Sequence, residues 1–586
     1  MVESTKNTNY GALATLTTVF FFWGFIAAGN SVFIPFCKEY FHLDQFQSQL
    51  IDFAFYLAYY MGALVLFTVG TARGKDLVGS WGYKMSIVYG LLFSALGAGV
   101  MIFSVYKDVF SGMLLGLFIV ALGFSLQQTS ANPFMISLGD ESTGSSRINL
   151  GGGINSLGTT IGPLIVALAL FGSAGAISDE MIKGLSLSKV MILYACVGAL
   201  FIGVALLLTF SKKLPSGKVE EKTQEGTGSS RKAMILLWTM TLSLAVCFTP
   251  VFMSYRSDEA KNIIQLEHDL DLVTKDEQGK ELTELTAVQL ETKAQIETEI
   301  SEIKKPLDQK RMVWYSAGLA VTVLGLILAF FMGKSKESEG WGAMKYPQLT
   351  LGMLAIFVYV GVEVAIGSNL GELLKQKDFG SHTSSEIAPY VAMFWGSLMI
   401  GRWAGAVNAF DLSQQTKTVL RFIVPLIAFG VVLGLTAAAG YKVDMLYWYI
   451  VCVIVQIVAF YLTKDKPALT LGVFGVLGVI AVLVGLMTKG DIAIYAFLSG
   501  GLFCSIMWPC IFSLALGGLG KHQPQGAAFL VMMILGGALI PPLQGKLSDV
   551  IGIQPSFIIG VICFAYLAFY AWFAKKSLKA QGVDFD

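Results

Sequence analysis

Charge is what this sequence has least of. Only 14% of its 586 residues are Asp, Glu, Lys or Arg, whereas 55% are hydrophobic. A soluble protein usually carries about 25% charged residues. The shortage of charge therefore excludes a water-exposed globular fold for most of the chain and predicts a surface that meets lipid. A net charge of +1, with no basic cluster, gives no support for nucleic-acid binding.

Residue types that usually carry catalysis or hold metals are also scarce. The seven cysteines include no C-x-x-C pair, and the four histidines all lie in loops or at the ends of apolar runs. This excludes the common zinc and dithiol motifs and makes a histidine proton relay unexpected. The sequence also lacks a nucleophile–base pair and a phosphate-binding loop. It predicts a protein that is not an enzyme and has no cofactor, unless a cation is a co-substrate.

Long apolar runs are what the sequence has in excess. A bilayer core about 30 Å thick needs roughly 20 apolar residues per helix. Sixteen stretches meet that requirement, near residues 11–36, 47–70, 84–105, 109–135, 149–172, 187–210, 233–254, 312–332, 347–371, 386–409, 418–440, 444–464, 467–487, 490–516, 525–547 and 553–577. The predicted fold class is an all-α, multi-pass membrane protein. An even number of spans places both termini on one side.

Basic residues in the short loops predict which side that is. They concentrate in one alternate set of loops and in the tail, at Arg73, Lys75, Lys84, Arg147, Lys212, Lys213, Lys218, Arg231, Lys232, Lys334, Lys336, Lys345, Lys575, Lys576 and Lys579. Cytoplasmic loops carry such an excess, so both termini are expected in the cytoplasm. Segment 255–311 then lies outside. Its helical periodicity on either side of "KDEQGKE" predicts a helical hairpin, read as a solvated cap or, alternatively, a partner-binding element.

One polar stretch stands out inside the fourth span. "QQTSANPFMISLG" resembles the A-N-P-[FY] signature of the fucose–galactose–glucose symporter family, which belongs to the major facilitator superfamily. Further stretches resemble the family's fifth, seventh and tenth helices, in the order "SSRINLGGGINSLGTTIGP", "IFVYVGVEVAIGS" and "SIMWPCIFSLALGGLG". The resemblance implies the major facilitator fold, with two six-helix bundles and transport of a sugar by alternating access.

The family has twelve spans, so the resemblance also implies where this chain adds helices. The expected divisions are an N-terminal six-helix bundle at 1–211, a cytoplasmic linker at 212–232, two extra helices carrying the outer hairpin at 233–346, and a C-terminal bundle at 347–586. Two more extra helices are inserted in that bundle at 418–464.

Charge marks the main departure from the family. In fucose members, an acid in the first helix and one in the fourth are associated with proton coupling. This chain has Ser31 and Gln128 at the matching positions, and neither side chain titrates near neutral pH. Sodium coupling, proton coupling through other residues, and uncoupled facilitated transport all remain open.

Polar and aromatic side chains within the spans are the candidate sugar ligands. Amides donate and accept as sugar hydroxyls do, and aromatic faces pack on a pyranose ring. The candidates are Asn30, Gln127, Gln128, Asn132, Asn155, Tyr359, Glu363, Asn369 and Trp508. Hydrogen bonds that only join helices are the alternative for each single amide.

Carboxylates buried in a membrane usually mark a coupling site or pathway. Asp52 and Glu363 are the two candidates here. Asp52 has expected neutral neighbours in Ser31 and Thr129, and oxygen ligands suit a hard cation. We therefore favour sodium coupling through Asp52, with Glu363 contacting the sugar or sharing in the coupling.

Three further charged residues are expected in gating or structural roles. Asp76, in a loop that resembles a superfamily motif, would latch one conformation, and Arg147 and Arg402 would hold helix ends or carboxylates. The predicted protein is a monomeric, cation-coupled monosaccharide symporter of a bacterial inner membrane, carrying glucose, galactose, fucose or an amino sugar. A membrane sensor or scaffold that uses the outer hairpin is the alternative from another class.

Overall fold

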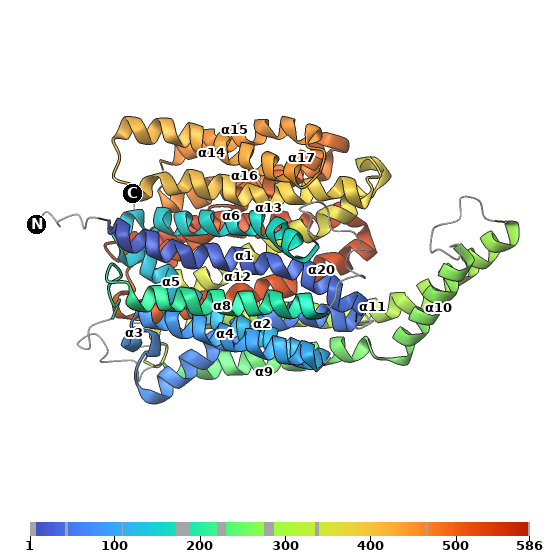
Figure 1. Cartoon of the computed structure of the whole chain (residues 1–586), viewed down its shortest axis with the longest axis horizontal. Coiled ribbons are helices and arrows are strands. Elements are labelled where there is room, and N and C mark those ends of the chain that lie inside the picture. Colours follow the sequence, from blue (N-terminus) through green and yellow to red (C-terminus); the bar gives the residue numbers. More distant parts are fainter. Residues whose placement is uncertain are drawn as a thin grey trace, which may run out of the picture.

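The computed structural model describes residues 8–40, 45–107, 109–171, 187–218, 230–274, 286–333, 339–464 and 466–583. The side chains of residues 27–52, 163–164, 166–167, 169–171, 187 and 384–385 lie outside this description. Every regular element in the described part is a helix, which confirms the all-α prediction. The helices run side by side in one bundle. The start of α1 and the end of α22 lie at the same end of it, called here the terminus end (Figure 1).

Thirteen helices of the described part are long and apolar enough to cross a membrane. This confirms a multi-pass membrane protein. The predicted spans at 11–36, 149–172 and 386–409 coincide with helices α1, α6 and α13, which are not among the thirteen. The number sixteen therefore stays a prediction.

The first half of the bundle comprises the helices that precede residue 211. They are α1 (Tyr10–Tyr40), α2 (Gln45–Arg73), the short α3 (Leu77–Trp81), α4 (Tyr83–Tyr106), α5 (Phe110–Ser137), α6 (Gly144–Phe171) and α8 (Leu187–Phe210). Small residues bring α4 and α5 together, since a Cβ atom on Gly97 would lie 2.6 Å from the backbone nitrogen of Val120. Such close approach is the usual way in which membrane helices pack.

The second half begins at α12. Its helices are α12 (Pro347–Leu374), α13 (Ser384–Ala406), α14 (Gln414–Ala438), α15 (Ile450–Thr463), α16 (Pro467–Met487), α17 (Gly490–Cys504), α18 (Met507–Leu516), α19 (Gln523–Met532), α20 (Gly536–Ile551), α21 (Ile553–Ser556) and α22 (Ile558–Ala580). The additional pair α14 and α15 packs against α13, α16 and α17.

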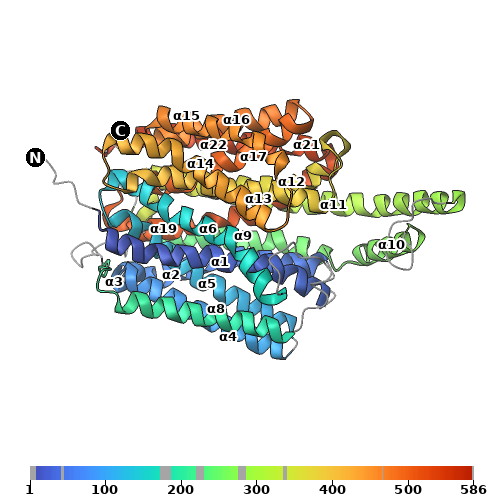
Figure 2. The same cartoon turned by 45° about the horizontal axis from the view of Figure 1, so that its top comes forward.

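The helices inserted between the halves are α9 (Arg231–Ser254), α10 (Asp258–Thr274) and the long α11 (Ala287–Gly333). Helix α9 packs on α11 and touches α2, while α11 packs on α12 and α20. Helix α10 and the first part of α11 project beyond the bundle, at the end opposite the termini (Figures 1 and 2). This projecting pair is the hairpin that the periodicity of 255–311 predicts.

A charged cluster fixes the base of the hairpin. Arg311 is buried, stacks over the Tyr255 ring at 3.8 Å and donates to the Ser254 hydroxyl at 2.8 Å. Asp308 accepts from Arg311 at 3.1 Å and from Lys546 of α20 at 2.8 Å. The carboxylate thus ties the hairpin to the second half.

Candidate functional site

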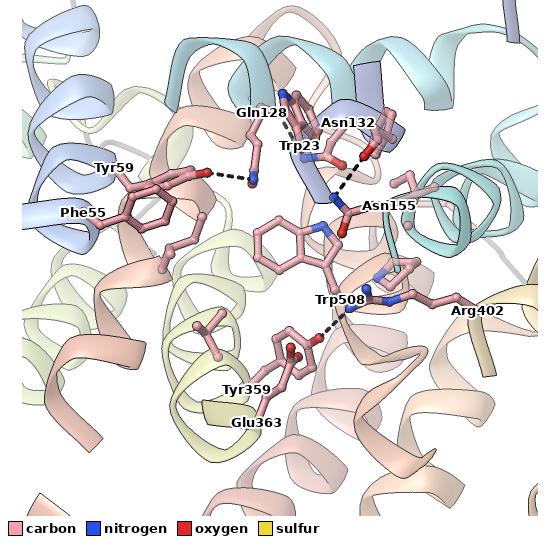
Figure 3. Close-up of a pocket in the computed structure, with 16 residues that line it drawn as sticks. Trp23, Phe55, Tyr59, Gln128, Asn132, Asn155, Tyr359, Glu363, Arg402 and Trp508 are labelled. Carbon is pink, nitrogen blue, oxygen red and sulfur yellow. Dashed lines mark hydrogen bonds between the residues drawn. The ribbon is translucent and has the colours of Figure 1, made fainter. Parts of the chain in front are cut away.

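The candidate site is a cavity of about 210 Å³ between the two halves. Helices α1, α2, α5 and α6 line it from the first half, and α12, α13 and α18 line it from the second. Seven residues singled out from the sequence lie on its walls: Gln128, Asn132, Asn155, Tyr359, Glu363, Arg402 and Trp508. The structure brings these side chains together from segments that are far apart in the sequence (Figure 3).

Amide groups line the wall formed by the first half. Gln128 and Asn132 lie one turn apart on α5, so they share a face of that helix. Gln128 donates from Nε2 to the Tyr59 hydroxyl at 3.2 Å, and Asn132 donates from Nδ2 to the Gln128 carbonyl at 3.0 Å. Asn155 of α6 donates from Nδ2 to the Phe20 carbonyl of α1 at 3.0 Å. Each amide is therefore held by a partner within the same half.

The opposite wall carries the charged groups. Tyr359 and Glu363 lie one turn apart on α12, and Trp508 lies between them and the amide wall (Figure 3). Among the described residues, no hydrogen-bond partner reaches the buried Oε2 atom of Glu363. A buried polar atom without a partner is rare in folded proteins. This oxygen is available to a bound molecule or a proton.

Arg402 connects this wall to the other half. Its Nε donates to the Ser505 carbonyl at 3.2 Å, and its Nη1 donates to the Ser156 hydroxyl of α6 at 2.8 Å. A weaker bond of 3.4 Å runs from Nη2 to the Tyr359 hydroxyl. The guanidinium thus serves three neutral acceptors and remains beside Glu363.

A proline makes one of these acceptors available. In an unbroken helix the Ser505 carbonyl would accept from the backbone nitrogen four residues later, which is position 509. Pro509 has no N–H group, and the helix is interrupted one turn earlier, at Ser505 and Ile506 between α17 and α18. The freed carbonyl accepts from Arg402 instead.

Gln127 and Asn369 were expected to face the cavity, and the structure corrects both expectations. Thr129 was expected beside Asp52, whose side chain lies outside the described residues, so that expectation stays a prediction. Gln127 is fully buried, accepts from the Trp23 indole at 2.5 Å and donates to the Ser94 hydroxyl at 3.1 Å. Thr129 bonds to the Ser125 carbonyl and Asn369 to the Ala365 carbonyl, both at 2.8 Å.

Helix rotation explains where these side chains point. Each residue turns the helix by about 100°, so Gln127 and Thr129 point to either side of Gln128. Gln127 consequently joins α5 to α1 and α4. Asn369 lies six residues after Glu363, a rotation of about 240° away from it.

Asn30, Ser31 and Asp52 were also expected at the site. Their side chains lie outside the described residues. The sodium ligands predicted around Asp52 therefore stay a prediction.

Asp76 and Arg147 were expected in gating or structural roles. Both lie away from the cavity. Asp76 caps α3, where it accepts from the Gly79 backbone at 2.7 Å, and burial raises the pKa of its carboxyl. Arg147 donates to the carbonyls of Met135, Ile136 and Asp140. The Met135 and Ile136 carbonyls lie in the last turn of α5 and lack partners within the helix. The Asp140 carbonyl lies in the segment that follows, so Arg147 ties the end of α5 to that segment.

Sequence reasoning missed several contributors to the site. Phe20, Phe55 and Tyr59 line the cavity, and Ser156 and Ser505 hold Arg402. Phe55 and Tyr59 lie four residues apart on α2, a helical spacing that could have indicated one aromatic face. No signal in the sequence pairs either serine with Arg402.

The two halves meet closely at the terminus end. Tyr10 of α1 stacks on Phe410, just after α13, with ring centroids 6.1 Å apart. Phe67 of α2 meets Phe529 of α19 at 4.7 Å, and the Trp403 indole donates to the Gly153 carbonyl at 3.1 Å. These contacts join the halves on the terminus side of the cavity.

Solved structures share this arrangement of helices. The chain matches the crystal structure of a variant of the Escherichia coli fucose:proton symporter with a TM-score of 0.58 and 19% identity, covering 97% of this chain and 99% of that one. A structure of a major facilitator superfamily transporter in the outward conformation matches with a TM-score of 0.56 and 20% identity, over 96% and 98% of the two chains. The chain has the major facilitator fold.

Sequence relatives agree with this fold. The chain is 27% identical to a glucose/galactose transporter of Brucella abortus biovar 1, covering 98% of this chain and 97% of the relative. It is 22% identical to an L-fucose-proton symporter of Escherichia coli, covering 96% and 93%. No protein-family model matches the chain. These relatives are transporters rather than enzymes, and the resemblance to the fucose–galactose–glucose symporter family is confirmed.

Proposed function

We propose that this major facilitator protein is a secondary active transporter that carries a monosaccharide together with a cation. One observation carries the proposal: the cavity between the halves is lined by amides on one side and by Tyr359, Glu363 and Trp508 on the other. Amides match the donor and acceptor character of sugar hydroxyls. Aromatic rings pack on the apolar face of a sugar. The relatives named glucose/galactose transporter support glucose or galactose as the first candidates, with fucose and amino sugars next.

Alternating access follows from the position of the cavity. Transporter sites of this kind lie where two halves meet and rock against each other. The contacts at the terminus end, such as Tyr10 with Phe410, would be those that break when the cavity opens towards that side. We infer that this side is cytoplasmic because the basic loops lie there. The bacterial relatives favour an inner membrane, and a cavity complete within one chain favours a monomer.

The coupling cation is proposed to be sodium or a proton. Asp52 and Glu363 are the candidate coupling groups, since Ser31 and Gln128 stand where fucose members have acids. A sodium ion would need an ionised carboxylate with neutral oxygens around it. A proton would need a carboxyl group that can hold it, and the unpartnered Oε2 of Glu363 supports that alternative.

The test is uptake into proteoliposomes that contain the purified full chain. Labelled glucose, galactose, fucose and glucosamine would be offered under separately imposed sodium and proton gradients. Accumulation of one sugar above its outside concentration under one gradient is the expected result. Equilibration without accumulation would indicate an uncoupled facilitator. Absence of both uptake and exchange for all four sugars would reject the proposal and favour a sensor or scaffold.

A further inference from the structure

Two amides on the wall of the cavity cannot turn over. The Nδ2 atom of Asn155 lies 3.0 Å from the Phe20 carbonyl oxygen, and the Nδ2 atom of Asn132 lies 3.0 Å from the Gln128 carbonyl oxygen. A backbone carbonyl can only accept a hydrogen bond. Rotating either amide by half a turn would bring two acceptor oxygens into contact. The chemistry of the partner thus fixes which end of each amide faces the protein.

The other end of each amide therefore faces the cavity. Asn132 and Asn155 both line it, and within the described part of the chain no group donates to the Oδ1 atom of either side chain. An amide oxygen accepts and never donates. The first half thus presents a pair of fixed acceptors to whatever occupies the cavity.

The second half presents donors. The Arg402 guanidinium and the Trp508 indole can only donate, and no described acceptor receives the Trp508 N–H group. Glu363 and Tyr359 are the exceptions, because an ionised carboxylate accepts and the Tyr359 hydroxyl both donates and accepts. The two walls of the cavity therefore differ in hydrogen-bond direction (Figure 3).

We propose that the cavity selects sugars by the direction of their hydrogen bonds, with hydroxyls that face the first half donating to Asn132 and Asn155, and hydroxyls that face the second half accepting from Arg402 and Trp508. This inference rests on the proposed function. It identifies the substrate class as pyranoses with free hydroxyl donors along one edge. Sugars whose oxygens on that edge are methylated or replaced by fluorine are rejected.

Gln128 provides an internal contrast. Its Nε2 bonds to the Tyr59 hydroxyl at 3.2 Å, and a hydroxyl both donates and accepts. This amide can turn over and present either group. Tyr59 therefore holds Gln128 without fixing which end of its amide faces the cavity.

Fluorinated sugars distinguish sugar hydroxyls that donate a hydrogen bond from those that accept one, because a carbon–fluorine group cannot donate and accepts only weakly. The experiment measures equilibrium binding of D-glucose and its full set of monodeoxy and monofluoro analogues to the purified full chain. At two ring positions the deoxy and fluoro analogues are both expected to bind roughly tenfold or more weakly, the usual cost of an unpaired buried acceptor. Where a hydroxyl accepts from Arg402 or Trp508, the fluoro analogue is expected to bind better than the deoxy analogue.

Variants assign each position to a residue. Asn132→Ala and Asn155→Ala are each expected to bind glucose more weakly and to lose discrimination at one of the two positions. The exposed Asn262 of α10 supplies the control, since Asn262→Ala removes the same amide outside the bundle. Thermal unfolding of each variant verifies that it folds. If a variant does not fold, the binding of the deoxy and fluoro analogues to the unaltered chain tests the inference instead.

Three results would count against the inference, in two different ways. Glucose binding with fluoro analogues stronger than deoxy analogues at every position would overturn the directional selection and leave sugar transport standing. Unchanged profiles in both asparagine variants would do the same. Failure of glucose, galactose, fucose and glucosamine alike to bind the folded chain would reject the proposed function itself.

Discussion

Arg402 of α13 donates a hydrogen bond across the interface of the two halves to Ser156 of α6, over 2.8 Å. The same guanidinium bonds to the Ser505 carbonyl at the break between α17 and α18. The wall of the cavity and the contact between the halves therefore share one side chain. Any rocking of the halves must break this bond or replace it with another.

Arg402→Lys tests that shared role. Lysine keeps the charge but lacks the planar fork that reaches three acceptors. We expect a folded protein whose sugar transport falls roughly tenfold or more, because at least one buried acceptor stays unpaired. Uptake and exchange in proteoliposomes measure the loss, and thermal unfolding monitors the fold. Wild-type transport by the lysine variant would show that the bond to Ser156 is dispensable.

Neighbouring glutamines should respond differently to the same substitution. Gln128→Ala removes a group from the cavity and should weaken sugar binding by roughly 1–3 kcal/mol with little change in stability. Gln127→Ala leaves the Trp23 indole without its acceptor and removes the bond donated to Ser94, which keeps its own bond to the Val120 carbonyl. It should lower the free energy of unfolding by a similar amount while sugar affinity stays. Binding and thermal unfolding of the two variants give the comparison. Equal effects on affinity would contradict the placement of Gln127 outside the site.

Asp52→Asn tests sodium coupling. The variant keeps an oxygen ligand and loses the charge that a cation needs. We expect it to lose accumulation driven by a sodium gradient while it still exchanges labelled for unlabelled sugar. Glu363→Gln makes the same carboxylate-to-amide change at the other candidate coupling group, in the second half. If Asp52→Asn still concentrates sugar in sodium, the coupling does not run through Asp52.

Membrane sidedness can be measured with single cysteines. Glu291 of α11 and Lys218 after α8 are both exposed. A membrane-impermeant thiol reagent added to whole cells should label Glu291→Cys and spare Lys218→Cys, because basic loops stay in the cytoplasm. The unaltered chain provides the background from its own cysteines. The reverse labelling pattern would invert the proposed orientation.

A covalent cross-link across the terminus end tests whether this end opens during transport. Tyr10 and Phe410 stack with ring planes only 4° apart, so cysteines at both positions should be joined by a short bifunctional thiol reagent. Joining them should stop net sugar uptake, since the halves could no longer separate on this side. Each single-cysteine variant treated alike is the control. Undiminished uptake by the joined protein would show that this end does not open during transport.

Much of the architecture could be predicted from the sequence, because it depends on properties of short stretches of the chain. Apolar length predicts helices that span a bilayer, and periodicity predicted the hairpin that α10 and α11 form. The amides at Gln128 and Asn132 were identifiable because polar groups inside an apolar helix need a partner or water. These inferences require only residues that are neighbours along the chain.

The tertiary structure alone decided which polar groups face the cavity and what holds them. Helix rotation separated Gln128 from Gln127, although both are amides on the same span. Arg402 bonds to Ser156, which lies 246 positions away in the sequence, and Tyr59 bonds to Gln128 from another helix. Composition and spacing cannot determine such pairings, because they depend on how whole helices are turned and packed against one another. The sequence by itself therefore determined a sugar-transporter-like membrane bundle, and packing decided the direction in which its cavity offers hydrogen bonds.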